Sequence, residues 1–379
     1  MASVLSLTAC GGSSATDPRT VSEPFAALWG AVQPNTWRSH GDDVFAVYVC
    51  KVPAHTTVSL YGDLPARRSF TATDIVQAIG EGVTDYFSTI SAGAYRPSFV
   101  VGGEIDLSTT DTPERCARAA IASAPATARA VLLVANAEHV ATAAGGLGTG
   151  GTPCALDAAT GCPVSQSQRW AYVGAADFSP ERIAHPPLDL VEHEIGHTLG
   201  WVHSGTAAPN GEEGVYDSSL DVMSNSAAPR SVDQNRRDAP DTLSIDRIVS
   251  GWLPLDHIAS VGGNEADVAL APSNAEGGDQ SGRRSSAPNV LVLPVDRSDF
   301  LTVEVLDAAG YDAHLPASGV AIHAVTSKRG ELYRVVPQFG TPPFDQLAQA
   351  GDRIVARGWT ITVGQRSDGR FTVHVRRQQ

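Results

Sequence analysis

The chain has 379 residues, of which 42% are hydrophobic and 18% are charged. This composition is typical of a folded protein with a sizeable core, is long enough for two domains, and excludes disorder as the main state. The net charge of -14 argues against nucleic acid or an anionic membrane surface as the main partner, and no apolar run reaches the roughly 18 residues that a membrane-spanning helix needs.

The first ten residues end in Leu-Thr-Ala-Cys10, followed by Gly-Gly-Ser-Ser. This stretch resembles the end of a bacterial lipoprotein signal peptide, in which the cysteine becomes lipidated. The signal is truncated, since no Lys or Arg precedes Cys10 and the apolar part is short; the alternative is an ordinary disordered N-terminus. The resemblance implies an extracellular or cell-surface location with a membrane tether through Cys10. Residues 11–40, rich in Gly, Ser, Thr and Pro, are expected to form an unstructured tether.

Strand and helix patterns alternate between residues 41 and 175. Residues 43–50 form a near-continuous apolar run, which is typical of a strand covered on both faces. Residues 73–90 carry apolar side chains at three- and four-residue steps, which predicts an amphipathic helix. Similar patterns give strands at 98–107, 130–134 and 169–175 and a helix at 114–122. Such alternation predicts an α/β fold.

Residues 143–151 hold several glycines and superficially resemble a phosphate-binding loop. No Gly-Lys-Ser or Gly-Lys-Thr follows, so the lysine and hydroxyl that contact phosphate and magnesium are missing. We therefore expect a flexible loop at the rim of a cleft.

Residues 193–203 read His-Glu-Ile-Gly-His-Thr-Leu-Gly-Trp-Val-His. Pro186-Pro187 and a capping box formed by Asp189 and Glu192 are expected to start a helix here. On that helix His193 and His197 share one face and can bind the same zinc ion. Glu194 can act as general base without ligating the metal, and Gly200 allows a left-handed turn that brings His203 in as third ligand.

These residues match the metzincin signature His-Glu-x-x-His-x-x-Gly-x-x-His. A tight turn with a methionine lies beneath the ligands in that family, and Asp-Val-Met-Ser around Met223 resembles it. Residues 243–253 look like an amphipathic closing helix that ends in Gly-Trp-Leu, similar to gametolysin-like and immune-inhibitor-A-like bacterial secreted metallopeptidases. The resemblance covers residues 41–255 and implies an α/β (α+β) catalytic domain with a mixed, mostly parallel sheet.

Cys50, Cys116, Cys154 and Cys162 form an even set, which fits disulfides in an oxidising compartment. The short loop between Cys154 and Cys162 favours a bond between these two, leaving Cys50 and Cys116 as the second pair. Two alternatives stay open: a second zinc held by Cys154 and Cys162, and a latency switch in which Cys50 ligates the active-site zinc.

Residues 256–379 follow a period of two and predict an all-β, sandwich-like accessory domain. The loop 273–288 is expected to be exposed. Residues 310–323 resemble, more weakly, a domain that follows the catalytic domain in immune-inhibitor-A-like peptidases. The predicted strands are 290–293, 301–305, 319–324 and 332–336, with a hairpin of 359–363 and 371–375.

The sequence therefore predicts a secreted or surface-tethered zinc metalloendopeptidase that acts on proteins or peptides, with water activated by zinc and deprotonated by Glu194. The alternative is a non-catalytic, zinc-containing cell-surface binding lipoprotein. Tyr216 is a weaker candidate for assisting at the oxyanion. Asp177, Asp217 and Asp221 are weaker candidates for binding calcium or for supporting the zinc ligands.

Overall fold

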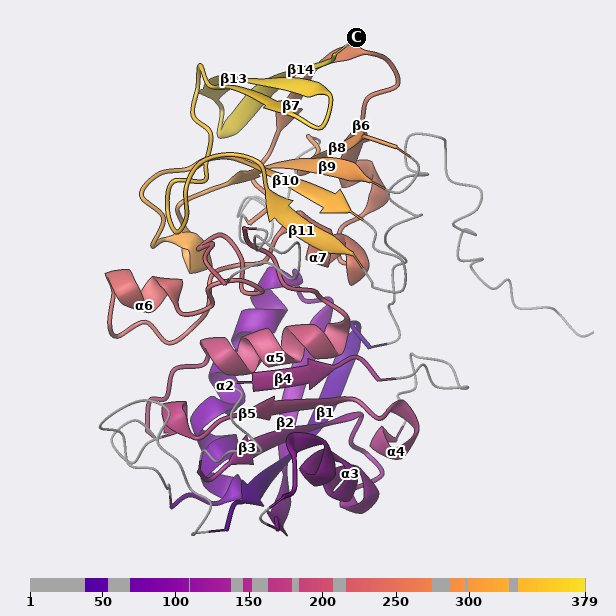
Figure 1. The fold of residues 1–379 in the computed structure, drawn as a ribbon, viewed down its shortest axis with the longest axis vertical. Helices are drawn as coiled ribbons and strands as arrows, with labels where there is room; N and C mark the ends of the chain where they lie inside the picture. Colours follow the sequence, from indigo (N-terminus) through magenta and orange to yellow (C-terminus); the bar gives the residue numbers. More distant parts are fainter. Residues whose placement is uncertain are drawn as a thin grey trace, which may run out of the picture.

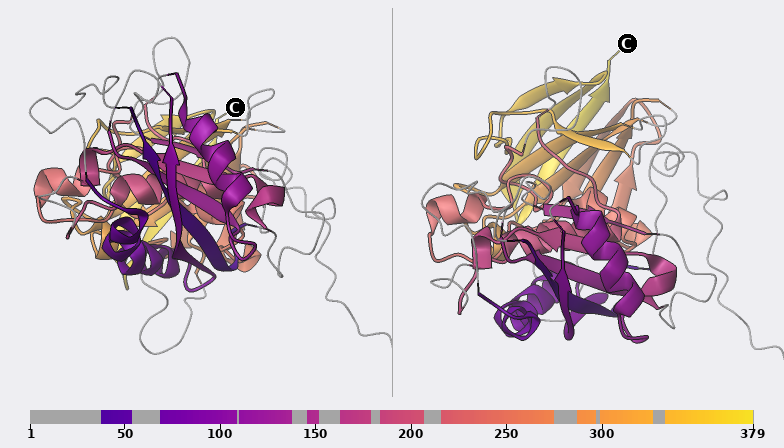
Figure 2. Two further views of the ribbon diagram at one scale, coloured as in Figure 1. Left: turned by 90° about the horizontal axis from the view of Figure 1, so that it is seen from below. Right: turned by 60° about the horizontal axis from the view of Figure 1, so that its bottom comes forward.

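The computed structural model describes residues 38–53, 69–108, 110–137, 146–151, 163–178, 184–206, 216–274, 287–296, 299–326 and 333–378. The fold is mixed α/β with a C-terminal β-rich region, in line with the predicted class (Figure 1). Its strands form three sheets, one in the N-terminal part and two in the C-terminal part. Figure 2 shows the two C-terminal sheets on one side of the molecule and the first sheet on the other.

The first sheet has five strands in the order β2-β1-β3-β5-β4. The four strands β2, β1, β3 and β5 are parallel and β4 is antiparallel to β5, so the sheet is mixed and mostly parallel. The strands are β1 (Gly41–Lys51), β2 (Tyr95–Asp106), β3 (Ala130–Ala135), β4 (Gly146–Thr149) and β5 (Trp170–Val173).

Helices cover both faces of this sheet. Apolar residues of α2 (Ala72–Ile90) and α5 (Asp189–Leu199) share a core with one set of β1 side chains. Residues of α3 (Pro113–Ser123) and α4 (Val164–Ser167) share a core with the alternate set. Burial on both faces explains why β1 is a continuous apolar run, as the sequence predicted.

A disulfide joins Cys50 on β1 to Cys116 on α3. This pair confirms one of the two predicted bonds. Because the Cys50 sulfur is bonded and lies in the core beneath α3, the alternative in which Cys50 ligates a metal is wrong. The predicted partners Cys154 and Cys162 lie outside the described residues, as does Cys10.

Strand β4 corrects one expectation. Residues 143–151 were expected to form a flexible loop, but Gly146–Thr149 pair with β5 along the edge of the sheet. The physical reason lies at Gly148, where an added Cβ would meet His197 Cβ at 2.5 Å and the Glu194 carbonyl oxygen at 2.6 Å. Glycine therefore lets this strand pack directly against α5, a requirement that strand propensity does not reveal.

The first C-terminal sheet has the order β11-β10-β9-β8-β6, and the second has the order β12-β13-β14-β7. Neighbouring strands are antiparallel except for β6 and β8. Apolar side chains from both sheets meet in one core, which makes the pair a sandwich. The strands are β6 (Ile258–Ser260), β7 (Glu265–Leu270), β8 (Val290–Pro294), β9 (Phe300–Leu306), β10 (Gly319–Thr326), β11 (Arg334–Pro337), β12 (Arg353–Ala356), β13 (Trp359–Ser367) and β14 (Arg370–Arg377).

The predicted hairpin joins β13 to β14 through Asp368 and Gly369, with φ angles of 50° and 74°. These positive angles are those of the tight hairpin turn that Asp-Gly favours. Strands β6, β7 and β12 were not predicted, because each is short or partly polar.

The N-terminal and C-terminal parts share one hydrophobic core. Phe300, Ala321 and Val335 from the first C-terminal sheet belong to the same cluster as Trp201 and Met223. The face of that sheet opposite the sandwich core therefore packs against the part of the chain that holds the histidine motif.

Helix α7 (Ser244–Val249) lies at this junction and ends before Gly251, whose φ is 70°. The predicted helix that stops at Gly251 is therefore confirmed, but all six residues of α7 are buried, so the polar face expected of an amphipathic helix is not exposed. Its polar residues are kept inside by hydrogen bonds rather than by exposure to water. The remaining short elements are α6 (Ala228–Val232), η6 (Ala176–Phe178), η7 (Leu255–His257) and η8 (Gly310–Asp312).

Two segments that were expected to be exposed contain buried residues. Residues 38–40 were assigned to the tether, but Arg38 and Ser39 are buried, and Ser39 Oγ donates to Ser250 O at 2.8 Å. The predicted exposed loop at 273–288 lies mostly outside the described residues, and Asn274 within it is buried. None of the helices in the described ranges has the length and apolar character needed to cross a membrane.

Candidate metal centre

Helix α5 carries the first two histidines and begins at Asp189, two residues after Pro187. The predicted capping box is wrong, because Leu188 occupies the N-cap and no side chain caps the helix. Asp189 instead pairs with Arg230, and Glu192 Oε2 accepts from Ala239 N at 2.8 Å. Tertiary partners have replaced the local hydrogen bonds that the sequence pattern suggested.

The three histidines of the motif converge. One nitrogen each from His193, His197 and His203 lies within 4.8 Å of the other two. His193 and His197 lie one turn apart on α5, and Gly200 ends the helix with φ 95° and ψ 15°, as predicted. The chain then returns so that His203 Nε2 lies 2.8 Å from His197 Nε2. Among the described residues, this is the one group of three potential metal ligands.

Backbone carbonyl groups orient the two helical imidazoles. His193 Nδ1 lies 2.7 Å from Val222 O, and His197 Nδ1 lies 3.0 Å from Trp201 O. A carbonyl can only accept, so each Nδ1 is assigned as the protonated donor. Each Nε2 is then left with a lone pair, which is the form that binds a metal.

The surroundings of His193 disfavour a positive charge on its imidazole. Burial lowers the pKa of His193 well below its ordinary value, and the neighbouring His197 and His203 lower it further. Neutral imidazole is therefore the stable form near pH 7, as a ligand set requires.

Glu194 lies beside the three histidines with its carboxylate inside the protein. The residue is 3% exposed, and its Oε2 has no hydrogen-bond partner among the described residues. Burial raises the pKa of this carboxyl well above its usual range. A buried, unpartnered carboxylate oxygen is costly unless a ligand completes its contacts, so the atom marks a site.

Met223 lies in a turn directly beneath α5. Its side chain is fully buried, and a Cβ added at Gly196 would meet Met223 Sδ at 2.6 Å and Trp201 Cε3 at 2.7 Å. The turn contacts the first ligand through the Val222 carbonyl described above. The methionine turn and the histidine helix therefore pack without intervening side chains.

Tyr216 approaches the third ligand from the outside. The residue is 56% exposed, and its hydroxyl lies 3.1 Å from His203 Nε2. The rings of Tyr216 and His203 are 4.6 Å apart. Tyr216, predicted as a weaker candidate, therefore lies beside the three histidines on the side that faces solvent.

The three aspartates proposed as supporting residues have separate surroundings. Asp217 Oδ1 accepts from Thr206 N at 3.0 Å, and the buried Asp221 Oδ2 accepts from Ser204 Oγ at 2.5 Å. Both thus hold the segment that follows His203. Asp177 lies on η6, and none of the three joins a group of potential metal ligands in the described part of the chain.

A buried ion pair beneath α5 was missed by the sequence reasoning. Arg169 contacts both carboxylate oxygens of Asp43, at 3.1 and 2.8 Å, and lies 3.2 Å from Thr198 Oγ1. Tyr95 OH donates to the same carboxylate at 2.7 Å. The available signal was an acid and an arginine, each at the start of an apolar strand.

The chain was compared with models of known protein families and with curated proteins, and neither comparison found a match. The class of site is therefore defined by its geometry alone: three convergent imidazoles with a buried carboxylate beside them.

Proposed function

We propose that this protein is a zinc-dependent endopeptidase of the metzincin type, secreted or tethered to the cell surface. The observation that carries the proposal is the convergence of three histidine nitrogens within 4.8 Å beside an unpartnered Glu194 carboxylate oxygen. A purely structural zinc site is usually closed by a fourth protein ligand and needs no base.

The residues present fit a zinc ion. Three imidazoles, two of them with Nδ1 held by a backbone carbonyl group and the third beside the Tyr216 hydroxyl, offer nitrogen donors of the kind zinc prefers. When bound, zinc would supply Lewis acidity, which favours deprotonation of water and polarises a carbonyl group. Calcium prefers oxygen ligands, and the described residues offer no such cluster.

Glu194 would perform the proton transfers. Its raised pKa makes it a stronger base than an ordinary carboxylate and lets it hold the proton that it takes from water. The same carboxyl would then donate that proton to the amine that leaves as the peptide bond breaks. The Tyr216 hydroxyl, on the solvent side of His203, is placed to donate to the carbonyl oxygen as it becomes negative.

An extended peptide is the substrate that suits the surroundings. Strand β4 is the last strand of its sheet, so one side of its backbone is not paired with another described strand. Gly148 on this strand packs against Glu194 and His197. A peptide that pairs with β4 would therefore run past the proposed base, and backbone pairing binds peptides with little regard to their sequence.

The decisive variant is Glu194→Gln, which keeps the shape of the side chain and removes the base. We expect zinc content to stay equal to that of the unmodified chain while casein cleavage falls by at least ~100-fold, the usual share of a general base. Metal analysis and a casein assay measure the two quantities. The matched control is Glu104→Gln at an exposed glutamate on β2, which should cleave casein normally.

Metal removal gives an independent check. Casein cleavage should stop in the presence of a chelator and return when zinc is added. Equal turnover in Glu194→Gln and the unmodified chain would exclude the mechanism. Full zinc occupancy without cleavage of any member of a broad protein library would support the non-catalytic binding protein instead.

The location outside the cytoplasm is part of the proposal. The Cys50–Cys116 disulfide suits an oxidising compartment. Diacylglycerol on Cys10, detected by mass spectrometry of the membrane fraction, would support the proposed tether, and an unmodified N-terminus in the soluble fraction would exclude it.

A further inference from the structure

The third histidine differs from the other two in how its position is set. His193 and His197 are fixed by the geometry of α5, whereas His203 lies beyond Gly200 in an irregular segment, residues 201–206. Such a segment holds a ligand in place only if its backbone is tied to other parts of the protein. Ser204 N donates to Met223 O at 3.1 Å and provides one such tie.

Other ties come from residues 333 and 335, which lie far along the chain at the start of β11 in the first C-terminal sheet. Gly205 N donates to Val335 O at 3.3 Å, and Ser204 and Val335 form a parallel bridge. The hydroxyl of Tyr333, the residue before β11, lies beside the Val202 backbone. Val202 and Ser204, the two residues that flank His203, are therefore both contacted by residues outside the motif.

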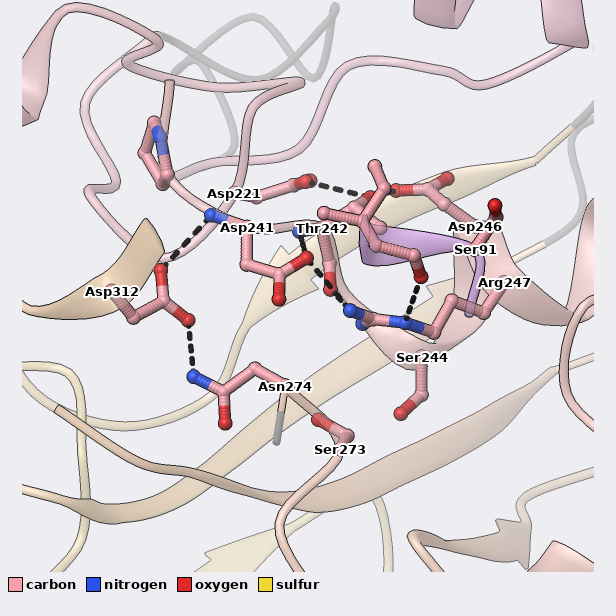
Figure 3. Close-up of polar contacts among 12 residues, drawn as sticks. Ser91, Asp221, Asp241, Thr242, Ser244, Asp246, Arg247, Ser273, Asn274 and Asp312 are labelled. Carbon is pink, nitrogen blue, oxygen red and sulfur yellow. Dashed lines mark hydrogen bonds and ion pairs between the residues drawn. The ribbon is translucent and has the colours of Figure 1, made fainter. Parts of the chain in front are cut away.

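Hydrogen bonds run from the Tyr333 hydroxyl beside Val202 to Ser204, and the chain through His203 completes a ring. Tyr333 OH lies 3.1 Å from Asp246 Oδ1, and Thr242 Oγ1 lies 2.9 Å from Asp246 Oδ2. The same Thr242 hydroxyl lies 3.3 Å from Asp221 Oδ1, and Ser204 Oγ donates to Asp221 Oδ2 at 2.5 Å. Figure 3 shows Asp221, Thr242 and Asp246 together beside α7. The ring consists of Val202, Tyr333, Asp246, Thr242, Asp221 and Ser204.

We propose that this ring positions His203 for metal binding, and that Tyr333 is a positioning residue supplied to the metal centre by the C-terminal part of the chain. The inference rests on the proposed metal centre. It adds that the C-terminal sheets help to hold one of the metal ligands in position. The C-terminal part is therefore more than an accessory that could be replaced without effect on the centre.

Burial makes the ring stiff. The side chains of Tyr333, Asp246, Thr242, Asp221 and Ser204 are all nearly or fully buried. Water cannot replace a lost partner at such positions as it would on the surface, so each hydrogen bond fixes the next group. Displacement of Val202 or Ser204 would move His203 between them, and a metal ligand tolerates only small shifts.

The test is Tyr333→Phe in the full chain, which removes the hydroxyl and keeps the ring in the core. We expect the dissociation constant for Zn²⁺, measured by competition with a chelator, to rise by about 10-fold, the lower end of the effect of groups that support ligands. The visible spectrum of the Co²⁺-substituted protein should also change, because it reports ligand geometry. Neither readout depends on peptidase activity.

The matched control is Trp359→Phe, which removes a different hydrogen bond of the C-terminal part. Its indole Nε1 donates to Pro294 O at 3.0 Å, and its ring lies in the core between the two C-terminal sheets, away from the His203 segment. We expect its Zn²⁺ affinity and Co²⁺ spectrum to equal those of the unmodified chain. An equal loss in both variants would mean general loosening and would overturn the proposal.

A second variant, Ser204→Ala, removes the hydrogen bond between the Ser204 hydroxyl and Asp221 and so breaks the ring at a different point. If the ring acts as a unit, the double variant with Tyr333→Phe should lose less Zn²⁺ affinity than the two single losses added together. Unchanged affinity in both single variants, with zinc bound by the unmodified chain, would overturn this inference alone. Absence of Zn²⁺ binding by the unmodified chain would remove the metal centre and the proposed function with it.

Discussion

At the scale of the residue, Gly196 shows how tightly the proposed centre is assembled. It lies on α5 between the two helical histidines, where the helix meets Met223 and the ring of Trp201. Any side chain at this position would push the helix away from the methionine turn. Because Val222 of that turn orients His193, such a shift would reach the ligands.

We therefore expect Gly196→Ala to lower the free energy of unfolding and to weaken zinc binding. Overpacking costs about 1–3 kcal/mol, which outweighs the roughly 1 kcal/mol that alanine gains over glycine in a helix. Gly80→Ala is the control, since a Cβ at Gly80 on α2 meets no atom within 4 Å. That variant should be more stable by about 0.5–1 kcal/mol. Urea denaturation measures both, and equal gains in stability would contradict the expected crowding at Gly196.

At the scale of the element, the ion pair between Arg169 and Asp43 fixes α5 against the sheet. Asp43 belongs to β1, Arg169 immediately precedes β5, and Thr198 is on α5 next to His197. Both charged side chains are fully buried. Such a pair is not necessarily stabilising relative to apolar residues, but removal of Arg169 leaves the buried Asp43 carboxylate with only the Tyr95 hydroxyl and the more distant Arg129, 3.9 Å away.

Arg169→Met should accordingly lower the free energy of unfolding by about 3–5 kcal/mol. Asp43→Leu combined with Arg169→Met should recover part of this loss, because the buried Asp43 carboxylate is then removed together with its main partner. Lys51→Met removes one partner of the exposed pair with Glu104, and its melting temperature should stay close to that of the unmodified chain. A similar small effect for Arg169→Met would show that the buried pair does not hold these elements together.

At the scale of the whole molecule, buried acids gather where the C-terminal sheets meet the part of the chain that holds the three histidines. Burial raises the pKa of Asp221 to about 6 and raises the pKa of Asp246, Glu304 and Asp312 as well. The hydrogen bonds of the ring also favour a raised pKa, because Thr242 has only one hydroxyl hydrogen and lies between two carboxylates, those of Asp221 and Asp246. A proton on one of the two acids, Asp221 or Asp246, would complete the hydrogen bonds.

The raised pKa of Asp221 determines how the free energy of unfolding changes with pH. Between pH 4 and 6 Asp221 is protonated in the folded state and ionised in the unfolded state, so its stabilising contribution is complete below about pH 4 and is lost as the pH rises through about 6. Asp221→Asn removes this titration. Without metal, the free energy of unfolding of the unmodified chain should fall between pH 4 and 7 by about 3 kcal/mol more than that of the variant. Parallel urea-denaturation profiles for the two proteins would contradict the raised pKa.

The sequence only favoured the pairing of Cys50 with Cys116. By itself it determined the histidine helix, the turn at Gly200, and most strands on either side of residue 256. These features follow from local spacing: side chains four apart share a helix face, alternate residues share a strand face, and glycine permits a left-handed turn. Tertiary structure alone decided that Gly146–Thr149 form a strand, that Asp189 caps nothing, and that Tyr333 reaches the backbone beside His203. Each of these depends on which distant side chain or backbone group lies opposite, and such long-range contacts leave no period in the sequence.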